Sequence, residues 1–293
     1  MFSLDGYKAV TANGGVVRRA DRGVLAVSGA DRATWLQGLL TNDLEALKDG
    51  EVQYSAYLTP QGRMITDMHV APRDNRILLD VPLTLAATLR DKLDSLIFSE
   101  NAQVTDESAR LSVWTVIRRD DFVTVIDESL PDEFAGLVEI NLDTFEVIRI
   151  ERGVPRFLAD MNDDTIPLEA GIEDRAISFT KGCYVGQEVI VRVTHRGGGR
   201  VAKKLVRWIA DPSADIVPLP ESRIFSFNPS TSPSAGPSTS LTASKDIGRV
   251  TSAAFSPNVN RVVGLGYVHR DFTESGTDVT VMWNDSPIKA VVQ

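Results

Sequence analysis

Cysteine and histidine are scarce in this sequence. Cys183 is the single cysteine among 293 residues, and His69, His195 and His269 are the three histidines. One cysteine excludes an intramolecular disulfide and cannot supply the four thiolates that usually hold an iron–sulfur cluster. A chain without disulfides fits a reducing compartment, so we expect a cytoplasmic protein. The histidines lack the spacing of metal ligands, and we expect no metal site.

Long hydrophobic runs are also missing. No apolar stretch approaches the roughly 18 residues that a membrane helix requires, and residues 1–15 lack the apolar core of a signal peptide. We therefore expect no membrane partner. The composition, 43% hydrophobic and 24% charged, is typical of a globular protein. The length suffices for one large domain or for two or three small ones.

Negative charge predominates but is unevenly distributed. The chain has 40 acidic and 31 basic side chains, a net charge of −9, whereas residues 181–207 contain seven Lys or Arg and one Glu. An acidic protein is a poor general binder of nucleic acids, and we expect no such partner. The basic segment can collect a small anion, or it can be a solvated face that balances acidic neighbours.

Periodic apolar residues and turn residues predict a mixture of helices and strands. An amphipathic helix is expected over residues 31–40, and a second from Pro82 to about Ile97. Because hairpins are frequent, the mixture favours an α+β fold over a doubly wound sheet. The expected strands are 24–27, 52–58, 64–71, 77–81, 111–117, 122–126, 137–140, 201–209, 261–268 and 278–283.

Residues 228–244 have a different composition from the rest of the chain. Six Ser, three Thr and three Pro make up 12 of these 17 residues. Such a segment has too little apolar surface to offset the entropy of ordering it, so we expect a mobile insertion loop. A phosphorylated or binding tail is the functional alternative.

The sole cysteine lies within the stretch KGCYVGQE, residues 181–188. The thiolate is the reactive form of cysteine, and cations such as Lys181 and Arg192 nearby in sequence favour it. The flanking glycines, Gly182 and Gly186, permit another group to approach closely. Cys183 is therefore a candidate functional thiol. The alternative is a buried cysteine that acts as a small apolar filler.

This stretch, continued by VTHRG at residues 193–197, resembles the signature of the YgfZ-type folate-binding family. These proteins are relatives of the aminomethyltransferase (T-protein) of the glycine cleavage system and are associated with assembly or repair of iron–sulfur enzymes. The resemblance implies ferredoxin-like α+β folate-binding subdomains over residues 1–200, with 79–145 as an inserted α+β subdomain, followed by a small β-barrel over 201–293. It also implies a helix within 185–196, where β-branched residues locally favour a strand.

Tetrahydrofolate, or a one-carbon derivative of it, is the cofactor that the resemblance implies. T-protein relatives grip the pterin ring with the carboxylate of an Arg-hydrophobic-Glu pattern, which matches Arg149 to Glu151 here. One carboxylate can accept from both the N3–H and the 2-amino group of a pterin. Glu151 is the candidate ligand and Glu169 the second choice; the alternative for Glu151 is a surface ion pair with Arg149 or Arg152. The further candidate folate contacts are Lys181, Tyr184, Gln187 and Arg192.

One departure from the T-protein pattern bears on the reaction. Paired aspartates follow a glycine turn in that enzyme, whereas this chain has Thr66-Asp67 after Gly62-Arg63. The predicted function is therefore a tetrahydrofolate-binding accessory protein that supports iron–sulfur enzymes through Cys183. We expect folate as a partner, iron–sulfur enzymes or cluster-assembly proteins as clients, and a monomer. A folate-dependent aminomethyl transferase and a folate-independent scaffold are the alternatives.

Overall fold

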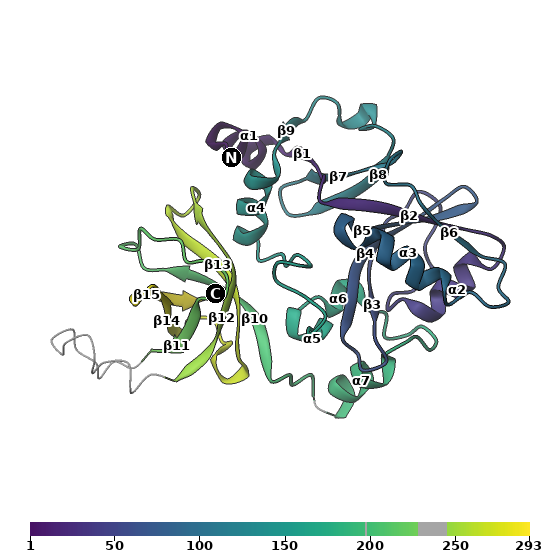
Figure 1. Cartoon of the computed structure of the whole chain (residues 1–293). Coiled ribbons are helices and arrows are strands. Elements are labelled where there is room, and N and C mark those ends of the chain that lie inside the picture. The colour runs from purple at the N-terminus through teal and green to yellow at the C-terminus, as the bar shows by residue number, and fades with distance from the viewer. Residues whose placement is uncertain (197, 228–244) are drawn as a thin grey trace. The chain divides into compact units, whose positions relative to one another are not determined.

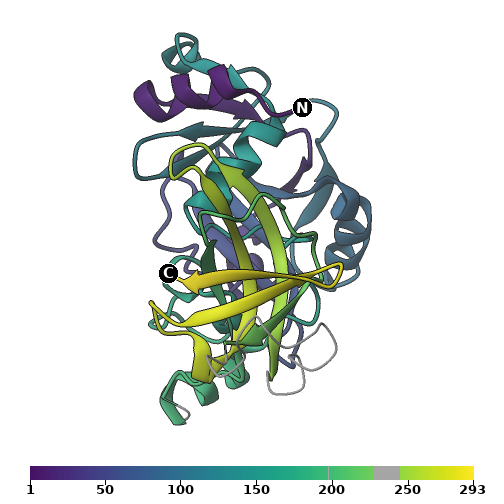
Figure 2. The ribbon, with the colours of Figure 1, turned by 90° about the vertical axis from the view of Figure 1, so that its left-hand side faces the viewer.

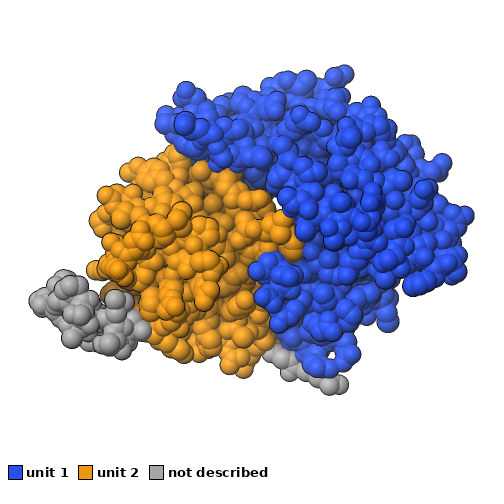
Figure 3. Space-filling view, in the orientation of Figure 1, with its two compact units in different colours: residues 1–145, 162–167, 172–196 blue, residues 146–161, 168–171, 197–293 orange. Residues whose placement is uncertain are grey.

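The computed structural model describes residues 1–196, 198–227 and 245–293 (Figure 1). The chain forms two compact units, which Figure 3 colours separately. Unit 1 comprises residues 1–145, 162–167 and 172–196, and unit 2 comprises residues 146–161, 168–171 and 197–293. The segment 228–244, for which the sequence predicts an insertion loop, lies outside the described residues.

The centre of unit 1 is a five-stranded antiparallel sheet in the order β3-β4-β5-β2-β6. Its strands are β2 (Arg22–Ser28), β3 (Gln53–Leu58), β4 (Met64–Arg73), β5 (Arg76–Pro82) and β6 (Gln103–Asp106). Two helices, α2 (Arg32–Leu39) and α3 (Ala86–Asp94), pack their apolar residues on one face of this sheet. A 3-10 turn at Leu83–Leu85 precedes α3. The helix expected from Pro82 to about Ile97 therefore begins later and ends earlier than predicted.

A second sheet completes unit 1. Its order is β8-β7-β1-β9, where β9 pairs with β1 in parallel and the other neighbours are antiparallel. Val24 and Ala26 of the first sheet share a buried cluster with Val113 and Ile126, so apolar side chains join the two sheets. The elements are α1 (Leu4–Asn13), β1 (Gly15–Arg18), β7 (Ser112–Ile117), β8 (Phe122–Asp127), a 3-10 turn at Asp132–Phe134 and β9 (Val138–Ile140).

Short helices follow in the second half of the chain. They are α4 (Leu142–Glu151), α5 (Pro167–Ala170), α6 (Glu173–Ala176), α7 (Gln187–Val191) and a π-helical turn at Arg192–Arg196. The last two confirm the helix that the family resemblance implies within 185–196, against the local preference for a strand. The reason is tertiary packing: Ile190 is fully buried, and Val189 lies against Gly62 of the β3–β4 turn.

Unit 2 contains a closed β-barrel with the strand order β10-β13-β12-β11-β14-β15 (Figures 1 and 2). Trp208 is fully buried at its centre, and a Cβ at Gly264 would lie 2.2 Å from the indole ring, so only glycine fits there. The strands are β10 (Lys203–Ala210), β11 (Arg223–Ser226), β12 (Asp246–Ser256), β13 (Arg261–His269), β14 (Asp278–Trp283) and β15 (Ser286–Val292). The α+β class and the C-terminal barrel are thus confirmed.

None of the helices in the described ranges combines the length and the apolar composition needed to cross a membrane.

Candidate functional site

Cys183 lies on the surface of unit 1, in a short irregular segment between α6 and α7. Its side chain is exposed, whereas Lys181 and Tyr184 on either side of it are buried. Two backbone hydrogen bonds hold the segment: Ser178 N donates to Thr41 O at 3.0 Å, and Val185 N donates to Gly38 O at 3.2 Å. The exposure of Cys183 rules out the alternative in which it is a buried apolar filler. The thiol is instead presented on a segment that is anchored on both sides.

Lys181 is the anchor on the N-terminal side of the thiol. Its ammonium group donates to the carbonyl oxygens of Gln37, Leu40 and Asn42, each at 2.8 Å. An ammonium group has three donors, so all of them are used within the protein. Burial lowers the pKa of Lys181 to about 8, although the nearby Asp43 opposes this shift. Lys181 thus ties the cysteine segment to the end of α2, and its predicted contact with folate remains a prediction.

Two glycines fix the C-terminal side of the same segment. Gly186 has a φ of +86°, and a Cβ on it would lie 2.6 Å from the carbonyl oxygen of Thr59. Gly62, in the β3–β4 turn, has a φ of +75°, and its Cβ would lie 2.9 Å from Val189 of α7. Side chains at either position would separate α7 from the hairpin. Gly186 of the motif therefore serves close packing, whereas a Cβ on Gly182 would meet no atom within 4 Å.

The remaining motif residues differ in how firmly they are held. Tyr184 is 7% exposed, burial raises its pKa to about 12, and the Lys181 ammonium lies 5.5 Å from its ring centroid. Gln187 Nε2 makes a long contact of 3.5 Å with Gly182 O. Arg192 is exposed and pairs with Glu188 one helical turn away at 2.5 Å. Of the predicted folate contacts in this segment, Gln187 is half-buried and Arg192 is exposed.

Replacing Lys181 with methionine is expected to loosen this segment. The change keeps the length of the side chain but leaves three buried or half-buried carbonyl groups without their donor. An unsatisfied buried polar group costs about 1–3 kcal/mol, so the free energy of unfolding in urea should fall by about that amount. Lys48→Met, at an exposed lysine, is the matched control and should change it by less than about 0.5 kcal/mol. Equal stability of the two variants would contradict the anchoring role.

A buried group of charged residues lies on the opposite face of the five-stranded sheet from α2 and α3. Arg22 Nε donates to Asp80 Oδ1 at 2.5 Å, and Arg22 Nη1 donates to Asp67 Oδ1 at 2.9 Å. Tyr54 Oη donates to the second oxygen of Asp67 at 2.9 Å. His69 Nδ1 lies 2.8 Å from Asp80 Oδ2. We call Arg22, Tyr54, Asp67, His69 and Asp80 the sheet network.

Electrostatics within the sheet network stabilises the ionised form of Asp80 and the neutral form of Tyr54. Burial alone would raise the pKa of Asp80, but Arg22 and His69 outweigh it and hold this pKa at about 2. Burial and the neighbouring Asp67 raise the pKa of Tyr54 well above its usual value. This network was not predicted from the sequence. Its signal was present, since Asp67 and His69 lie at alternate positions of β4 and Asp80 interrupts the apolar run from Ile77 to Val81 in β5.

Glu151, the predicted pterin ligand, ends helix α4 in unit 2. Its side chain is half-buried, and its backbone carbonyl accepts from Arg207 Nη1 at 2.6 Å. Arg149 does not form the surface ion pair with Glu151 that was one alternative for this glutamate. Arg149 is buried and donates to Glu146 Oε2 at 2.7 Å, to Asp160 Oδ2 at 2.7 Å and to Ser252 Oγ at 2.9 Å. The arginine of the pattern therefore joins α4 to barrel strand β12.

The carboxylate of Glu151 is chemically compatible with the pterin part of a folate. Glu151 is a half-buried carboxylate at a helix end, and such a group accepts from two adjacent pterin donors. Glu169, the second choice, is buried in α5 with Lys203 Nζ at 3.9 Å, so its charge is already partly balanced. No cluster of three potential metal ligands occurs among the residues of known placement.

Comparison with solved structures and with family models identifies the fold. The crystal structure of the glycine cleavage system aminomethyltransferase T from Bartonella henselae matches with a TM-score of 0.79, covering 99% of this chain and 88% of that one at 16% identity. Residues 223–293 match the family of glycine cleavage T-protein C-terminal barrel domains. The fold is that of the aminomethyltransferase (T-protein) class.

Comparison of sequences adds two relatives. The chain is 29% identical over 239 residues to the iron–sulfur cluster assembly factor IBA57 homolog, mitochondrial, of Neurospora crassa, across 67% of this chain and 54% of that protein. It is 26% identical over 238 residues to the tRNA-modifying protein YgfZ of Escherichia coli O157:H7, across 68% of this chain and 72% of that protein. The chain thus spans about half the length of the Neurospora relative. The resemblance to the YgfZ-type relatives of the T-protein is confirmed.

Proposed function

We propose that the protein binds tetrahydrofolate and supports the assembly or repair of iron–sulfur enzymes, with Cys183 as its functional thiol. The observation that carries the proposal is the exposure of Cys183 on a segment anchored by Lys181 and Val185. The similarity to a protein named as an iron–sulfur cluster assembly factor supports the same function. The iron–sulfur group belongs to the client, because one cysteine cannot hold a cluster.

The thiol suits this role by its chemistry and its placement. A thiolate is a soft ligand for iron and a nucleophile toward sulfur. Since Cys183 is exposed, a client can reach it without rearrangement of unit 1. The anchors on both sides limit the motion of the backbone, which lowers the entropy lost when a client binds.

Folate would contribute a pterin for recognition and a one-carbon unit for chemistry. Glu151 is the residue of this chain that we assign to the pterin. Gln187 and Arg192, which belong to unit 1, stay predicted folate contacts on the family resemblance alone. Tyr184 is buried, so in our proposal it supports the position of Cys183 and does not donate to the cofactor.

The sheet network disfavours an aminomethyl transferase that uses Asp67. Both carboxylate oxygens of Asp67 are occupied, one by Arg22 and the other by Tyr54. A general acid or base must reach the reacting group within hydrogen-bond distance, and a carboxylate with both oxygens engaged is poorly suited to it. Asp67 therefore has a structural role in our proposal, and the transferase becomes the second candidate.

Replacing Glu151 with glutamine should weaken folate binding. The substitution keeps the size of the side chain but exchanges one acceptor for a donor that faces the pterin donors. The loss of a charged hydrogen bond costs about 1.5–3 kcal/mol, so the Kd measured by calorimetry should rise about tenfold to a hundredfold. Glu139→Gln, at an exposed glutamate of β9, is the control and should leave the Kd unchanged. An unchanged Kd in Glu151→Gln would remove this residue from the site.

Calorimetry with several folates, combined with a deletion strain, tests the whole proposal. The wild-type protein should bind at least one reduced folate, and its gene should restore an iron–sulfur enzyme activity in the strain. Because Escherichia coli relatives are named for tRNA modification, modified nucleosides of tRNA are measured in the same strain. Restored enzyme activity without any folate binding would favour the scaffold alternative. Turnover of an aminomethyl donor would favour the transferase.

A further inference from the structure

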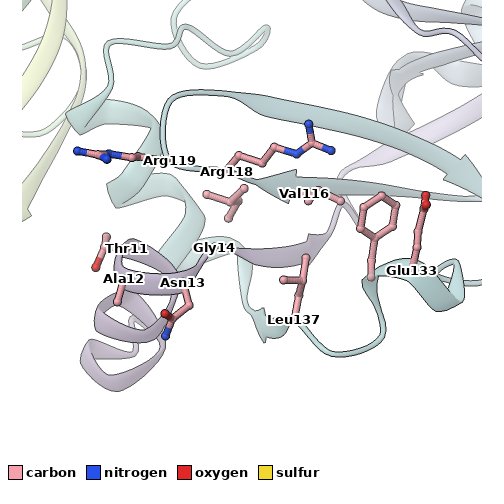
Figure 4. Close-up of a pocket in the computed structure, with 11 residues that line it drawn as sticks. Thr11, Ala12, Asn13, Gly14, Val116, Arg118, Arg119, Glu133 and Leu137 are labelled. Carbon is pink, nitrogen blue, oxygen red and sulfur yellow. The ribbon is translucent and has the colours of Figure 1, made fainter.

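A cavity of about 710 Å³ lies in unit 1 between the end of α1, the β7–β8 turn and the 3-10 turn at Asp132–Phe134 (Figure 4). The sequence motifs do not include it. Its floor contains Val116 and Ile117, whose side chains are buried, and its wall contains Phe134 and Leu137, which are half-buried. This volume falls within the range of sites that hold drug-sized ligands.

Two arginines at the rim set the charge of this cavity. Arg118 and Arg119 form the β7–β8 turn, where Arg118 N donates to Asp121 O at 3.0 Å. Across the described part of the chain, neither guanidinium group has a hydrogen bond, an ion pair or an aromatic contact. Every other arginine of unit 1 whose side chain is described makes at least one such contact. Among the arginines of unit 1 whose side chains are described, the two without such a contact therefore lie at this cavity.

The shape of the cavity comes from a close approach that requires glycine. Gly14 has a φ of +78°, and a Cβ on it would lie 2.9 Å from the carbonyl oxygen of Ile117. In Figure 4 the Arg118 side chain extends toward the side of the cavity that carries Glu133, whereas the Arg119 side chain extends toward the opposite side. Glu133 is the one acidic residue in the lining, so the ionisable lining residues carry a net charge of +1.

We propose that this cavity binds a small organic anion that combines a carboxylate or phosphate group with an apolar or aromatic body. Guanidinium groups match both anions through paired donors. The apolar floor and wall accept the body of the ligand. Glu133 disfavours ligands of high negative charge. The inference does not depend on folate binding, because none of the residues assigned to folate lines this cavity.

Nuclear magnetic resonance titration with defined probes tests the proposal. Phenyl phosphate carries a phosphate group and isophthalate carries carboxylate groups, each on a benzene ring. Benzyl alcohol, on the same ring, is the neutral control. We expect saturable shifts of the Gly14 and Ile117 amides with at least one anionic probe and none with benzyl alcohol. A response to phenyl phosphate alone assigns the site to phosphates, and a response to isophthalate alone assigns it to carboxylates. Affinity should fall as salt rises, since the arginines are exposed.

Variants of the rim separate this site from adventitious binding. Arg118→Gln with Arg119→Gln should raise the Kd of the probe about tenfold or more, whereas Arg90→Gln, at an exposed arginine of α3, should leave it unchanged. Glu133→Gln should lower the Kd about twofold to fivefold, because it removes the opposing charge. Glu151→Gln should have no effect on the probe, so failure here is distinct from failure of the folate proposal. Absence of saturable shifts, or equal affinity in the double variant, would overturn the inference.

Discussion

Replacing Cys183 with alanine is expected to abolish the support of iron–sulfur enzymes in a deletion strain. The side chain is exposed, so its loss removes a reactive group without creating a buried cavity. Folding and folate affinity should remain near those of the wild type, with a change in the free energy of unfolding below about 0.5 kcal/mol. The measurement is the activity of an iron–sulfur enzyme in cells that carry either gene.

Two comparisons make the Cys183 result specific. Cys183→Ser keeps nearly the size of the side chain but replaces the soft sulfur donor with a hydroxyl oxygen, so it should also be inactive. Thr180→Ala, at an exposed neighbour in the same segment, should be active. Native protein should also react readily with iodoacetamide, since the thiol is accessible. A fully active alanine variant would refute the functional thiol and leave folate binding as the proposed activity.

Replacing Asp80 with asparagine should cause a large loss of stability in unit 1. The change leaves Arg22 with one charged partner, Asp67, in a position where its side chain is 5% exposed. Removing one partner of a buried ion pair costs about 3–5 kcal/mol, because the remaining charge stays away from water. Asp127→Asn breaks the more exposed Arg73–Asp127 pair and should cost at most about 1 kcal/mol. Urea denaturation of both variants measures the difference.

The stability contributed by Asp80 should also depend on pH. Its pKa in the folded protein is about 2, lowered from 3.8. The unfolded chain therefore binds the proton more readily, so the contribution is fully present above about pH 4 and is lost as pH falls toward about 2. The shift corresponds to about 2 kcal/mol. This is less than the cost of Asp80→Asn, because protonation keeps both carboxyl oxygens near Arg22 and His69 in place.

The pH dependence has a direct measurement. The free energy of unfolding of the wild type should fall more steeply below about pH 4 than that of Asp80→Asn, which lacks this titrating group. If the free energies of unfolding of the two proteins fall with the same slope against pH, Asp80 is protonated equally in the folded and unfolded chains.

Local sequence signals were sufficient where one segment determines its own structure. The turn at Pro60 to Gly62 and the alternating apolar residues around it predict β3 and β4 close to their observed bounds. The helix at 31–40 corresponds to α2. In contrast, α1 and β1 were not predicted. β1 has only four residues, and it forms by pairing with β7 and β9, which lie about a hundred residues later.

The candidate site residues also fall into those that the sequence identifies and those whose contacts only the tertiary structure shows. The sequence identifies the sole cysteine, the motif around it and the resemblance to T-protein relatives. The sequence cannot assign the ammonium group of Lys181, because its acceptors lie 139 to 144 residues earlier in the chain. Arg149 was considered as a surface partner of Glu151, yet it is buried against Asp160 and Ser252. These hydrogen bonds exist only when distant segments have come together.

The sequence by itself determined the α+β class, the C-terminal barrel and the candidate thiol, since composition, spacing and motif are properties of the chain alone. Tertiary structure decided that Cys183 is exposed and that residues 187–196 are helical despite their β-branched side chains. It also gathered Arg22, Asp67 and Asp80 from three strands into one network. The physical reason is that burial and long-range hydrogen bonds depend on which segments pack together, and their free energies exceed the small local preferences that a sequence pattern reports.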